Sequence, residues 1–356
     1  MKQREKFISF DVISINEGGG FHIILSRNNL YTLLFIVGME FLDTSIEKVE
    51  REIKEMKVRG ALDIAIYASK AMKSLIESEA KDTSQLIEKL ENAGSRLKKT
   101  RPTAVSLPNA IDYILFLAKK RRDMQLEDFR KALKNDIDAF ISQLKDSLRK
   151  IAEIGSRLIE DGDVILTHCN SDTVVEILKR SFETGKEIKV ICTETRPRYQ
   201  GHITAKQLSK VGIPVTMIVD SAAFLAMEKF KVDKVMVGAD TICANGDVIN
   251  KVGTSQIALA AKELGIDFLV AVESIKFSPQ SVMGKIVEIE ERSRSEVLGR
   301  RMPEVSVYNP AFDITPAEYV TMLITELGVM PPQAAYLILK EKFGWELNFL
   351  RNEKFL

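Results

Sequence analysis

Two side chains that can move protons follow apolar runs in the C-terminal half of the chain. Cys169 follows the run at 164–167, and Asp240 follows the run at 235–237. A cysteine between a strand and a helix N-terminus is expected to have a lowered thiol pKa, because the helix dipole favours the thiolate. A carboxyl group whose pKa is raised by burial can act as an acid. The two positions therefore predict proton transfer.

Each of these residues also has an ordinary structural interpretation. Position alone does not decide between a reactive Cys169 and a small buried one. For Asp240 taken alone, helix capping is the commoner role. The other two cysteines, Cys192 inside a strand and Cys243 beside a turn, favour packing.

Positive side chains are expected at the same edge of the sheet as Cys169 and Asp240. Asn250 and Lys251 stand just before an alanine-rich helix, whose N-terminal N–H groups favour an anion. The spacing of a Walker loop is absent. Lys276 follows the strand expected at 268–272 and adds a second cation, although a lysine there is more often solvated. Arg196, after the strand at 188–191, adds a third on the same edge.

The N-terminal half offers two arginines at helix starts. Arg59 precedes Gly60 and Ala61, and Arg101 precedes a proline. Such a placement suits bidentate phosphate recognition, although a lone arginine at a helix end is usually only solvated. Together these cations predict a small phosphorylated ligand held between the two halves. No acidic cluster for magnesium accompanies them, which favours proton transfer over phosphoryl transfer.

Helical periodicity dominates the first half of the chain. Thr44 and Glu47 form a capping-box pattern ahead of apolar residues at helical spacing, and Thr83-Ser84 is expected to cap another helix. The stretch 126–158 keeps three- and four-residue apolar steps over many turns. It predicts a long helix that connects two halves.

From residue 161 the pattern changes to short buried strands alternating with helices. Runs at 164–167, 188–191, 215–219, 235–237 and 268–272 predict βαβ units, a parallel sheet and ligand binding at the carboxyl ends of its strands. Asn245-Gly246 predicts a hairpin turn. The expected fold class is α/β: a helical domain with its connecting helix at 39–160, then a Rossmann-like parallel-sheet domain at 161–356.

The composition indicates which partners, which compartment and which cofactors to expect. The chain has 356 residues, with 51 Lys and Arg against 50 Asp and Glu, so its net charge of +1 does not favour nucleic acid as a partner. Three cysteines predict a reducing compartment and a cytoplasmic protein. Three histidines argue against a multi-histidine metal site, and we expect neither a metal nor a cofactor.

The first 38 residues differ from the rest. The apolar run 30–38 is about half the length that spans a bilayer, and polar residues interrupt any signal-peptide pattern, so no membrane association is expected. A clear helix signal begins only after Met39. We interpret 1–38 as a non-native or poorly ordered extension, the alternative being a short strand packed on the body.

Several motifs together resemble the superfamily that joins methylthioribose-1-phosphate isomerases with regulatory subunits of the translation-initiation guanine-nucleotide exchange factor. The resemblance covers about residue 40 to the end, and within the superfamily it is strongest to archaeal ribose-1,5-bisphosphate isomerases. The segments that carry it start at Arg59, Arg101, His168, Glu194, Gly238, Asn250 and Asn309 and read Arg-Gly-Ala, Arg-Pro-Thr, His-Cys-Asn-Ser, Glu-Thr-Arg-Pro, Gly-Ala-Asp-Thr, Asn-Lys-Val-Gly-Thr and Asn-Pro-Ala-Phe-Asp-Ile-Thr-Pro.

This resemblance implies conversion of ribose 1,5-bisphosphate to ribulose 1,5-bisphosphate in AMP and nucleoside salvage. It implies Cys169 as proton acceptor and Asp240 as proton donor. It also implies a homo-oligomer, with dimers assembled into a hexamer, and activation by AMP. The substrate-binding positions that it implies are Arg59, Gly60, Ala61, Arg101, Ser171, Asn250, Lys251 and Lys276.

Two other functions stay open. An isomerase acting on methylthioribose 1-phosphate would need fewer phosphate-binding cations than this chain has. A non-catalytic regulatory subunit would have no need for both Cys169 and Asp240.

Overall fold

A computed structural model of the chain describes residues 45–55, 57–58, 60–100, 105–279, 281, 289–299, 302 and 304–343. The predicted extension 1–38 and the capping residue Thr44 lie outside them. The helices are α2 (Ile46–Lys54), α3 (Ala61–Leu75), α4 (Thr83–Lys98), α5 (Ser106–Lys120), α6 (Leu126–Ser156), α7 (Asp172–Glu183), α8 (Gly201–Lys210), α9 (Ala223–Phe230), α10 (Thr254–Glu263) and α11 (Ala335–Phe343). Short 3₁₀ turns include η1 (Asp220–Ala222), η2 (Ser274–Lys276), η4 (Arg294–Glu296), η5 (Ala317–Tyr319) and η6 (Pro332–Ala334).

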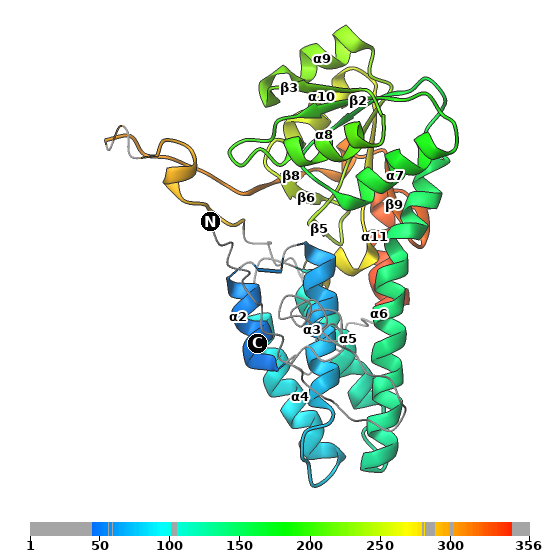
Figure 1. The fold of residues 1–356 in the computed structure, drawn as a ribbon, viewed down its shortest axis with the longest axis vertical. Coiled ribbons are helices and arrows are strands. Elements are labelled where there is room, and N and C mark those ends of the chain that lie inside the picture. The colour runs from blue at the N-terminus through cyan, green and yellow to red at the C-terminus, as the bar shows by residue number, and fades with distance from the viewer. Residues whose placement is uncertain are drawn as a thin grey trace, which may run out of the picture.

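Helices α2 to α5 and the first part of α6 form the lower body in Figure 1. They bury one shared apolar core, because each helix turns one face of apolar residues inward. The predicted face of α2 is confirmed: Ile46, Val49 and Ile53 are all buried. The core also takes in Ile275 of η2, which comes from the other half of the chain.

The start of α4 differs from the prediction. Asp82, and not the Thr83-Ser84 pair, caps the helix, since its carboxylate accepts a hydrogen bond of 2.8 Å from the Gln85 N–H. Thr83 is instead the first residue of the helix, and its hydroxyl donates to the Met124 carbonyl. The pattern Asp-Thr-Ser contains three good capping residues, and only tertiary packing chooses among them.

The long helix α6 has 31 residues. Its first two thirds, from Phe129 to Leu144, belong to the helical core, and Ile151 belongs to the core beside the sheet. Figure 1 shows α6 running the length of the lower body and reaching α7.

Seven strands form the main sheet in the order β10-β9-β7-β4-β1-β2-β3. Six of them are parallel, and β10 pairs antiparallel with β9. All five predicted strands are present within one or two residues of the expected ends, whereas the C-terminal strands were not predicted. The bounds are β1 (Val164–Thr167), β2 (Lys189–Thr193), β3 (Val215–Ile218), β4 (Lys234–Val237), β7 (Asp267–Ala271), β9 (Met322–Thr325) and β10 (Gly328–Met330).

A second, three-stranded sheet is inserted after β4. It contains β5 (Thr241–Ile242), β6 (Val248–Lys251) and β8 (Phe312–Thr315), with β6 antiparallel to both neighbours. The predicted hairpin turn at Asn245-Gly246 is confirmed between β5 and β6. Gly246 has φ of 91°, and a Cβ there would lie 2.6 Å from the Pro332 carbonyl oxygen, so glycine suits this turn on both counts.

The close approach of α6 to α7 depends on Gly155. A Cβ at this position would lie 2.5 Å from Cδ1 of the fully buried Ile177. We expect Gly155→Ala to lower the free energy of unfolding by about 1–3 kcal/mol, because the Ile177 side chain must move in a packed core. Urea titration measures the change. Adding Ile177→Val, which removes Cδ1, should recover part of the loss. If the losses in unfolding free energy of the two single variants simply add in the double variant, this explanation is contradicted.

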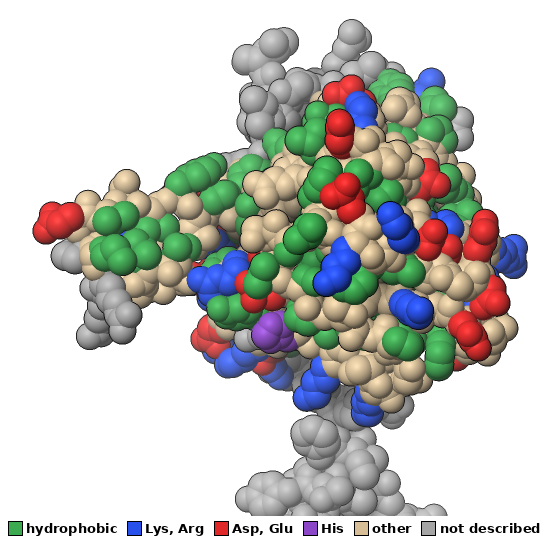
Figure 2. Space-filling model, turned by 90° about the horizontal axis from the view of Figure 1, so that it is seen from above, with side chains coloured by type: hydrophobic (Ala, Val, Ile, Leu, Met, Phe, Trp, Pro, Cys, Tyr) green, Lys and Arg blue, Asp and Glu red, His purple; other side chains and the backbone are tan. Residues whose placement is uncertain are grey.

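One segment leaves the body of the protein. Residues around η4 form a projection, gold to orange in Figure 1, and Figure 2 shows hydrophobic side chains on it. Val297, Met302, Val305 and Tyr308 are exposed, Tyr308 by 79%. Across the part of the chain that the structure describes, no helix is both long and apolar enough to cross a membrane.

Candidate active site

The predicted catalytic pair lies at the carboxyl edge of two adjacent strands. Cys169 comes two residues after β1, Asp240 comes three residues after β4, and β1 pairs with β4. The two side chains are close enough for the Asp240 charge to act on the Cys169 thiol. The structure therefore brings together two residues that are 71 positions apart in the chain.

Cys169 has an unusual backbone conformation. Its φ is 70°, in the left-handed region that costs energy for any residue other than glycine. Two threonines hold it there: the Cys169 N–H donates to Thr195 Oγ1 at 2.9 Å, and the Thr204 hydroxyl donates to the Cys169 carbonyl at 2.9 Å. Both threonines are buried, so the main chain of Cys169 is held from both sides.

The expectation of a lowered thiol pKa is wrong. Burial raises the pKa of Cys169 to about 12, and the Asp240 carboxylate adds to the rise, while Lys251 acts against it. Ser171 is the N-cap residue of α7, so Cys169 lies two residues ahead of it. The dipole effect fades within the first turn of a helix and does not outweigh desolvation.

This raised pKa predicts slow alkylation of Cys169. Relative to a thiol with pKa 9, a pKa of about 12 lowers the thiolate fraction near neutral pH by about 10³-fold. We expect iodoacetamide to label Cys169 slowly at pH 8, with a rate that keeps rising above pH 10. Peptide mass spectrometry measures each cysteine separately, and a labelling rate that levels off below pH 9 would contradict the assignment.

Lys251 and Asn250 lie on β6, beside the catalytic pair. Both are buried, and the Asn250 amide donates to Thr254 Oγ1 at 3.0 Å. Burial lowers the pKa of Lys251, although the charges of Cys169 and Asp240 favour its ammonium form. The predicted proximity of Lys251 to the two proton-transfer groups is thus present in the structure.

The predicted anion site at the N-terminus of α10 is already filled by the protein's own carboxylate. Asp313 of β8 accepts hydrogen bonds from Gly253 N at 2.7 Å, Ser255 N at 3.1 Å and Ser255 Oγ at 2.9 Å. A phosphate near Lys251 would therefore meet the lysine and Asn250, and not the N–H groups of this helix. Burial raises the pKa of Asp313.

Lys276 is placed between the two halves of the molecule. It is the last residue of η2, with Ile275 in the helical core and Phe277 in a second core beside the sheet, distinct from the one that contains Ile151. The Asn109 amide of α5 fixes this turn by donating to the carbonyls of Ile275 and Phe277 at 2.7 and 2.8 Å. Lys276 is thus held in place and not solvated.

Glu273 pairs with Lys276 at 2.7 Å, and the two side chains are only 6% and 13% exposed. Burial opposes the charge on Lys276, but the Glu273 carboxylate, with smaller effects from Asp240 and Asp172, raises its pKa above the ordinary value. Lys276 therefore keeps its positive charge, which the carboxylates of Glu273, Asp240 and Asp172 favour.

The helix starts of the lower body face the same region. Gly60, with φ of 87°, precedes α3, and the Ser106 hydroxyl at the start of α5 donates to the Ala61 carbonyl at 2.8 Å. Partial burial, followed by the charge of Asp172 on α7, raises the pKa of Asp63 in the first turn of α3. Arg59 and Arg101 lie outside the described residues.

Ser171, the remaining predicted binding residue, caps the start of α7. Its hydroxyl lies 2.7 Å from Thr173 Oγ1. A Cβ on Gly238 would lie 2.5 Å from Ser171 Oγ, so the glycine after β4 lets this serine approach the end of the strand. Ser171 thus lies between the strand ends that carry Cys169 and Asp240.

The structure adds residues that the sequence did not assign: His168, Thr195, Asp313, Glu273 and Asn109. His168 had one usable signal, since it is a histidine next to a strand-end cysteine. Thr195, Asp313 and Asn109 act across long sequence separations, and no local pattern predicts them. Glu273 pairs with Lys276 only three residues away, a spacing that is visible in the sequence.

A charged network borders the site from the projection. Glu296 accepts hydrogen bonds from Arg292 and Arg198, and the shortest bond from each arginine is 2.7 Å long. These guanidinium groups lower the pKa of Glu296 to about 2. The charge of Arg292 acts on Lys251. Arg196, the third cation expected on this edge, is exposed and lies over the Tyr199 ring.

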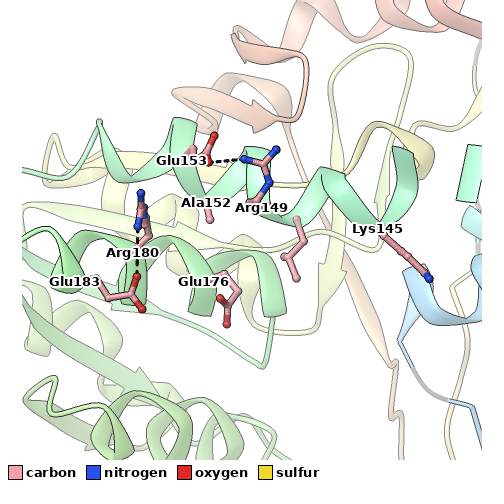
Figure 3. Close-up of a pocket in the computed structure, with 8 residues that line it drawn as sticks. Lys145, Arg149, Ala152, Glu153, Glu176, Arg180 and Glu183 are labelled. Carbon is pink, nitrogen blue, oxygen red and sulfur yellow. Dashed lines mark hydrogen bonds and ion pairs between the residues drawn. The ribbon is translucent and has the colours of Figure 1, made fainter. Parts of the chain in front are cut away.

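A cavity of about 500 Å³ lies elsewhere, between α6 and α7 (Figure 3). Its charged lining residues include paired ones, such as Arg149 with Glu153 and Arg180 with Glu183, and none of the lining residues comes from a strand end. The proton-transfer groups do not line this cavity. Of the residues that the structure describes, no three His, Cys, Asp or Glu side chains are grouped to hold a metal ion.

Residues 57–332 match the Initiation factor 2 subunit family. The chain belongs to this family. It is 46% identical over 310 residues to the ribose 1,5-bisphosphate isomerase of Pyrococcus furiosus, covering 85% of this chain and 95% of that protein. It is 37% identical over 305 residues to the methylthioribose-1-phosphate isomerase of Thermoanaerobacter pseudethanolicus, covering 82% and 88%.

A solved structure in the same family has the same architecture. The crystal structure of the translation initiation factor eIF-2B from Pyrococcus horikoshii superposes with a TM-score of 0.68 at 34% identity, covering 81% of this chain and 97% of that one. The α/β fold with a mostly parallel sheet and a helical N-terminal region is therefore that of the family.

Proposed function

We propose that the protein is an isomerase that converts ribose 1,5-bisphosphate to ribulose 1,5-bisphosphate by proton transfer between C2 and C1. The observation that carries the proposal is the mutual electrostatic influence of three residues: Cys169 and Asp240, which follow the paired strands β1 and β4, and Lys251 at the end of β6. A thiol, a carboxyl group and an ammonium group in one region form an acid–base pair with a charge that stabilises an oxyanion. Lys251 is buried there, and Cys169 and Asp240 are partly buried.

Cys169 and Asp240 share one exchangeable proton in the mechanism. With Asp240 protonated, its charge no longer raises the thiol pKa, and Lys251 favours the thiolate. Asp240 then donates a proton to the ring oxygen as the C1–O bond breaks, and the Cys169 thiolate takes the proton from C2. The enol phosphate that results receives the thiol proton at C1 and returns its hydroxyl proton to Asp240, which restores the starting state.

Cations in two places favour a substrate with two phosphates. Lys251 stands at the end of β6 with Arg292 nearby, whereas Lys276 lies within reach of the charge of Asp172 at the start of α7. A rigid pair of phosphate sites would hold C1 and C2 against the acid and the base, and orientation of this kind lowers the barrier. Gly60, Ala61, Ser171 and Asn250 would complete these sites, with Arg59 and Arg101 expected there from the sequence.

An isomerase assay in D₂O tests the function. We expect ribose 1,5-bisphosphate to give ribulose 1,5-bisphosphate with deuterium at C1, observed by NMR, because the transferred proton exchanges with solvent on the thiol. Product without deuterium would show that the hydrogen reaches C1 without exchange, as in a hydride shift, and would contradict this expectation.

Methylthioribose 1-phosphate in the same assay addresses the alternative isomerase. The 46% and 37% identities to the two kinds of isomerase favour the bisphosphate. A higher kcat/KM with the monophosphate would reverse the choice. Turnover of neither substrate, with AMP present, would favour a regulatory subunit.

We also propose two domains, 39–160 and 161–356, with α6 as the joining helix. Separate apolar cores in the two halves, both of which include α6 residues, support this division. A homo-oligomer and activation by AMP stay predictions from the resemblance, and a cytoplasmic location stays a prediction from the cysteines and the interrupted signal-peptide pattern. The exposed apolar projection supports self-association. Light scattering measures the oligomeric state, and turnover with and without AMP measures the activation.

A further inference from the structure

His168 lies next to Cys169 and uses both of its ring nitrogens. The residue is 1% exposed, Nδ1 lies 2.6 Å from Thr193 Oγ1, and Nε2 lies 3.0 Å from the Val252 carbonyl oxygen. A carbonyl oxygen only accepts, so Nε2 carries a proton. In the neutral ring Nδ1 then accepts from the Thr193 hydroxyl.

The surroundings of His168 favour this neutral form. Burial lowers its pKa, and the Lys251 charge acts in the same direction. The carboxylates of Asp220 and Asp313 act in the opposite direction but do not outweigh burial. A ring of fixed protonation state holds both hydrogen bonds in one arrangement.

Hydrogen bonds continue from His168 to the backbone of Cys169. Thr195 Oγ1 lies 3.4 Å from both the hydroxyl and the carbonyl oxygen of Thr193, and it accepts the Cys169 N–H at 2.9 Å. The Cys169 main chain is therefore linked through Thr195, Thr193 and His168 to the Val252 carbonyl. All three side chains of this link are buried.

Both ends of the link need to be held in place. At one end Cys169 has a φ of 70°, a conformation that persists only where neighbouring contacts impose it. At the other end the Val252 carbonyl belongs to the Val252–Gly253 peptide unit, one residue after Lys251 ends β6. Gly253 follows, and a Cβ there would lie 3.1 Å from the His168 ring, so the turn fits closely around the imidazole.

We propose that His168 is a positioning residue, which fixes the Cys169 thiol relative to the Lys251 ammonium group by linking the end of β1 to the turn between β6 and α10. Its effect on turnover rests on the proposed function, whereas the link itself is measurable without substrate. The sequence assigned no role to His168, and the reaction scheme above does not use it.

Graded replacements separate the two hydrogen bonds. His168→Asn keeps an acceptor near Nδ1, His168→Gln keeps a donor near Nε2, and His168→Leu removes both. Thr193→Val breaks the link one residue further on. His202→Asn is the matched control, since His202 is an exposed histidine on α8.

Two measurements follow the link: the iodoacetamide labelling rate of Cys169, by peptide mass spectrometry, and steady-state kinetics. In His168→Leu and Thr193→Val we expect labelling to rise by about tenfold and kcat to fall by about 10²-fold with little change in KM, because a small displacement of a catalytic group slows chemistry more than binding. The labelling rates and kcat values of His168→Asn and His168→Gln should lie between those of these variants and those of wild type, and His202→Asn should match wild type.

Thermal unfolding identifies any variant that does not fold. If His168→Leu or Thr193→Val does not fold, the Asn and Gln variants decide the result.

Unchanged Cys169 labelling in every folded His168 and Thr193 variant would overturn the proposal, whatever the kinetics show. A loss confined to KM would overturn it as well. If the labelling changes as expected but wild type turns over no ribose 1,5-bisphosphate, the proposed function fails and the link stands.

Discussion

Replacing Cys169 by serine should reduce kcat with ribose 1,5-bisphosphate by about 10³-fold, within the range that general acid–base catalysis contributes. A serine hydroxyl has nearly the same size but is a far weaker acid than a thiol, so it does not form the base that removes the C2 proton. Asp240→Asn removes the proton donor without changing the side-chain size and should have an effect of similar order. Steady-state kinetics of each single variant measure both losses.

Cys243→Ser is the matched control for this experiment. Cys243 is half-buried beside the β5–β6 hairpin, and burial raises the pKa of its thiol to about 11, as it does for Cys169 to about 12. The two thiols thus have similarly raised pKa values, but Cys169 follows β1 in the candidate active site and Cys243 lies beside the hairpin. Near-normal kcat for Cys169→Ser, or an equal loss for Cys243→Ser, would refute the catalytic role of Cys169.

Lys276→Met should be the most destabilising of the substitutions considered, by about 3–5 kcal/mol in the free energy of unfolding. The reason is Glu273, whose carboxylate is 2.7 Å from the lysine and has a side chain only 6% exposed. Without the ammonium group a buried negative charge loses its partner. Urea titration by circular dichroism measures the loss.

A second substitution tests that explanation. Lys276→Met combined with Glu273→Gln removes both charges and should recover much of the stability, because the penalty comes from the unpaired carboxylate. Lys262→Met is the exposed control: Lys262 and Glu318 are 3.4 Å apart but 46% and 68% exposed, so solvent screens the pair. Equal losses for the two single lysine variants would contradict the burial argument.

The same ion pair predicts a pH dependence. The pKa of Lys276 is raised in the folded protein, so its contribution to stability is fully present below the ordinary lysine pKa of about 10.4. The contribution is lost as the pH rises through the folded-state pKa. Wild type should therefore lose its stability advantage over the double variant only in strongly alkaline solution.

Local pattern was enough to predict much of the fold. The runs at 164–167 and 188–191 are short, apolar and separated by helical periodicity, and each lies in a parallel strand of the structure. Two of the strands that were not predicted have weak local patterns: Phe312–Thr315 contains a charged residue, and Gly328–Met330 has three residues. Such strands are defined by their partners in the sheet. Met322–Thr325 is as apolar as Val164–Thr167, so its local pattern was sufficient to predict it.

The sequence by itself determined which residue types stand at the strand ends. Cys169, Asp240 and Lys276 follow strands of the parallel sheet, and Lys251 ends a strand of the second sheet. Tertiary structure alone decided their state. Burial, and not the helix dipole, controls the Cys169 thiol. Asp313 fills the anion position at α10. Lys276 keeps its charge in a buried site, beside the Glu273 carboxylate. Periodicity follows from neighbours along the chain, whereas desolvation depends on residues brought close only by folding, so the protonation of this site is a property of the folded chain.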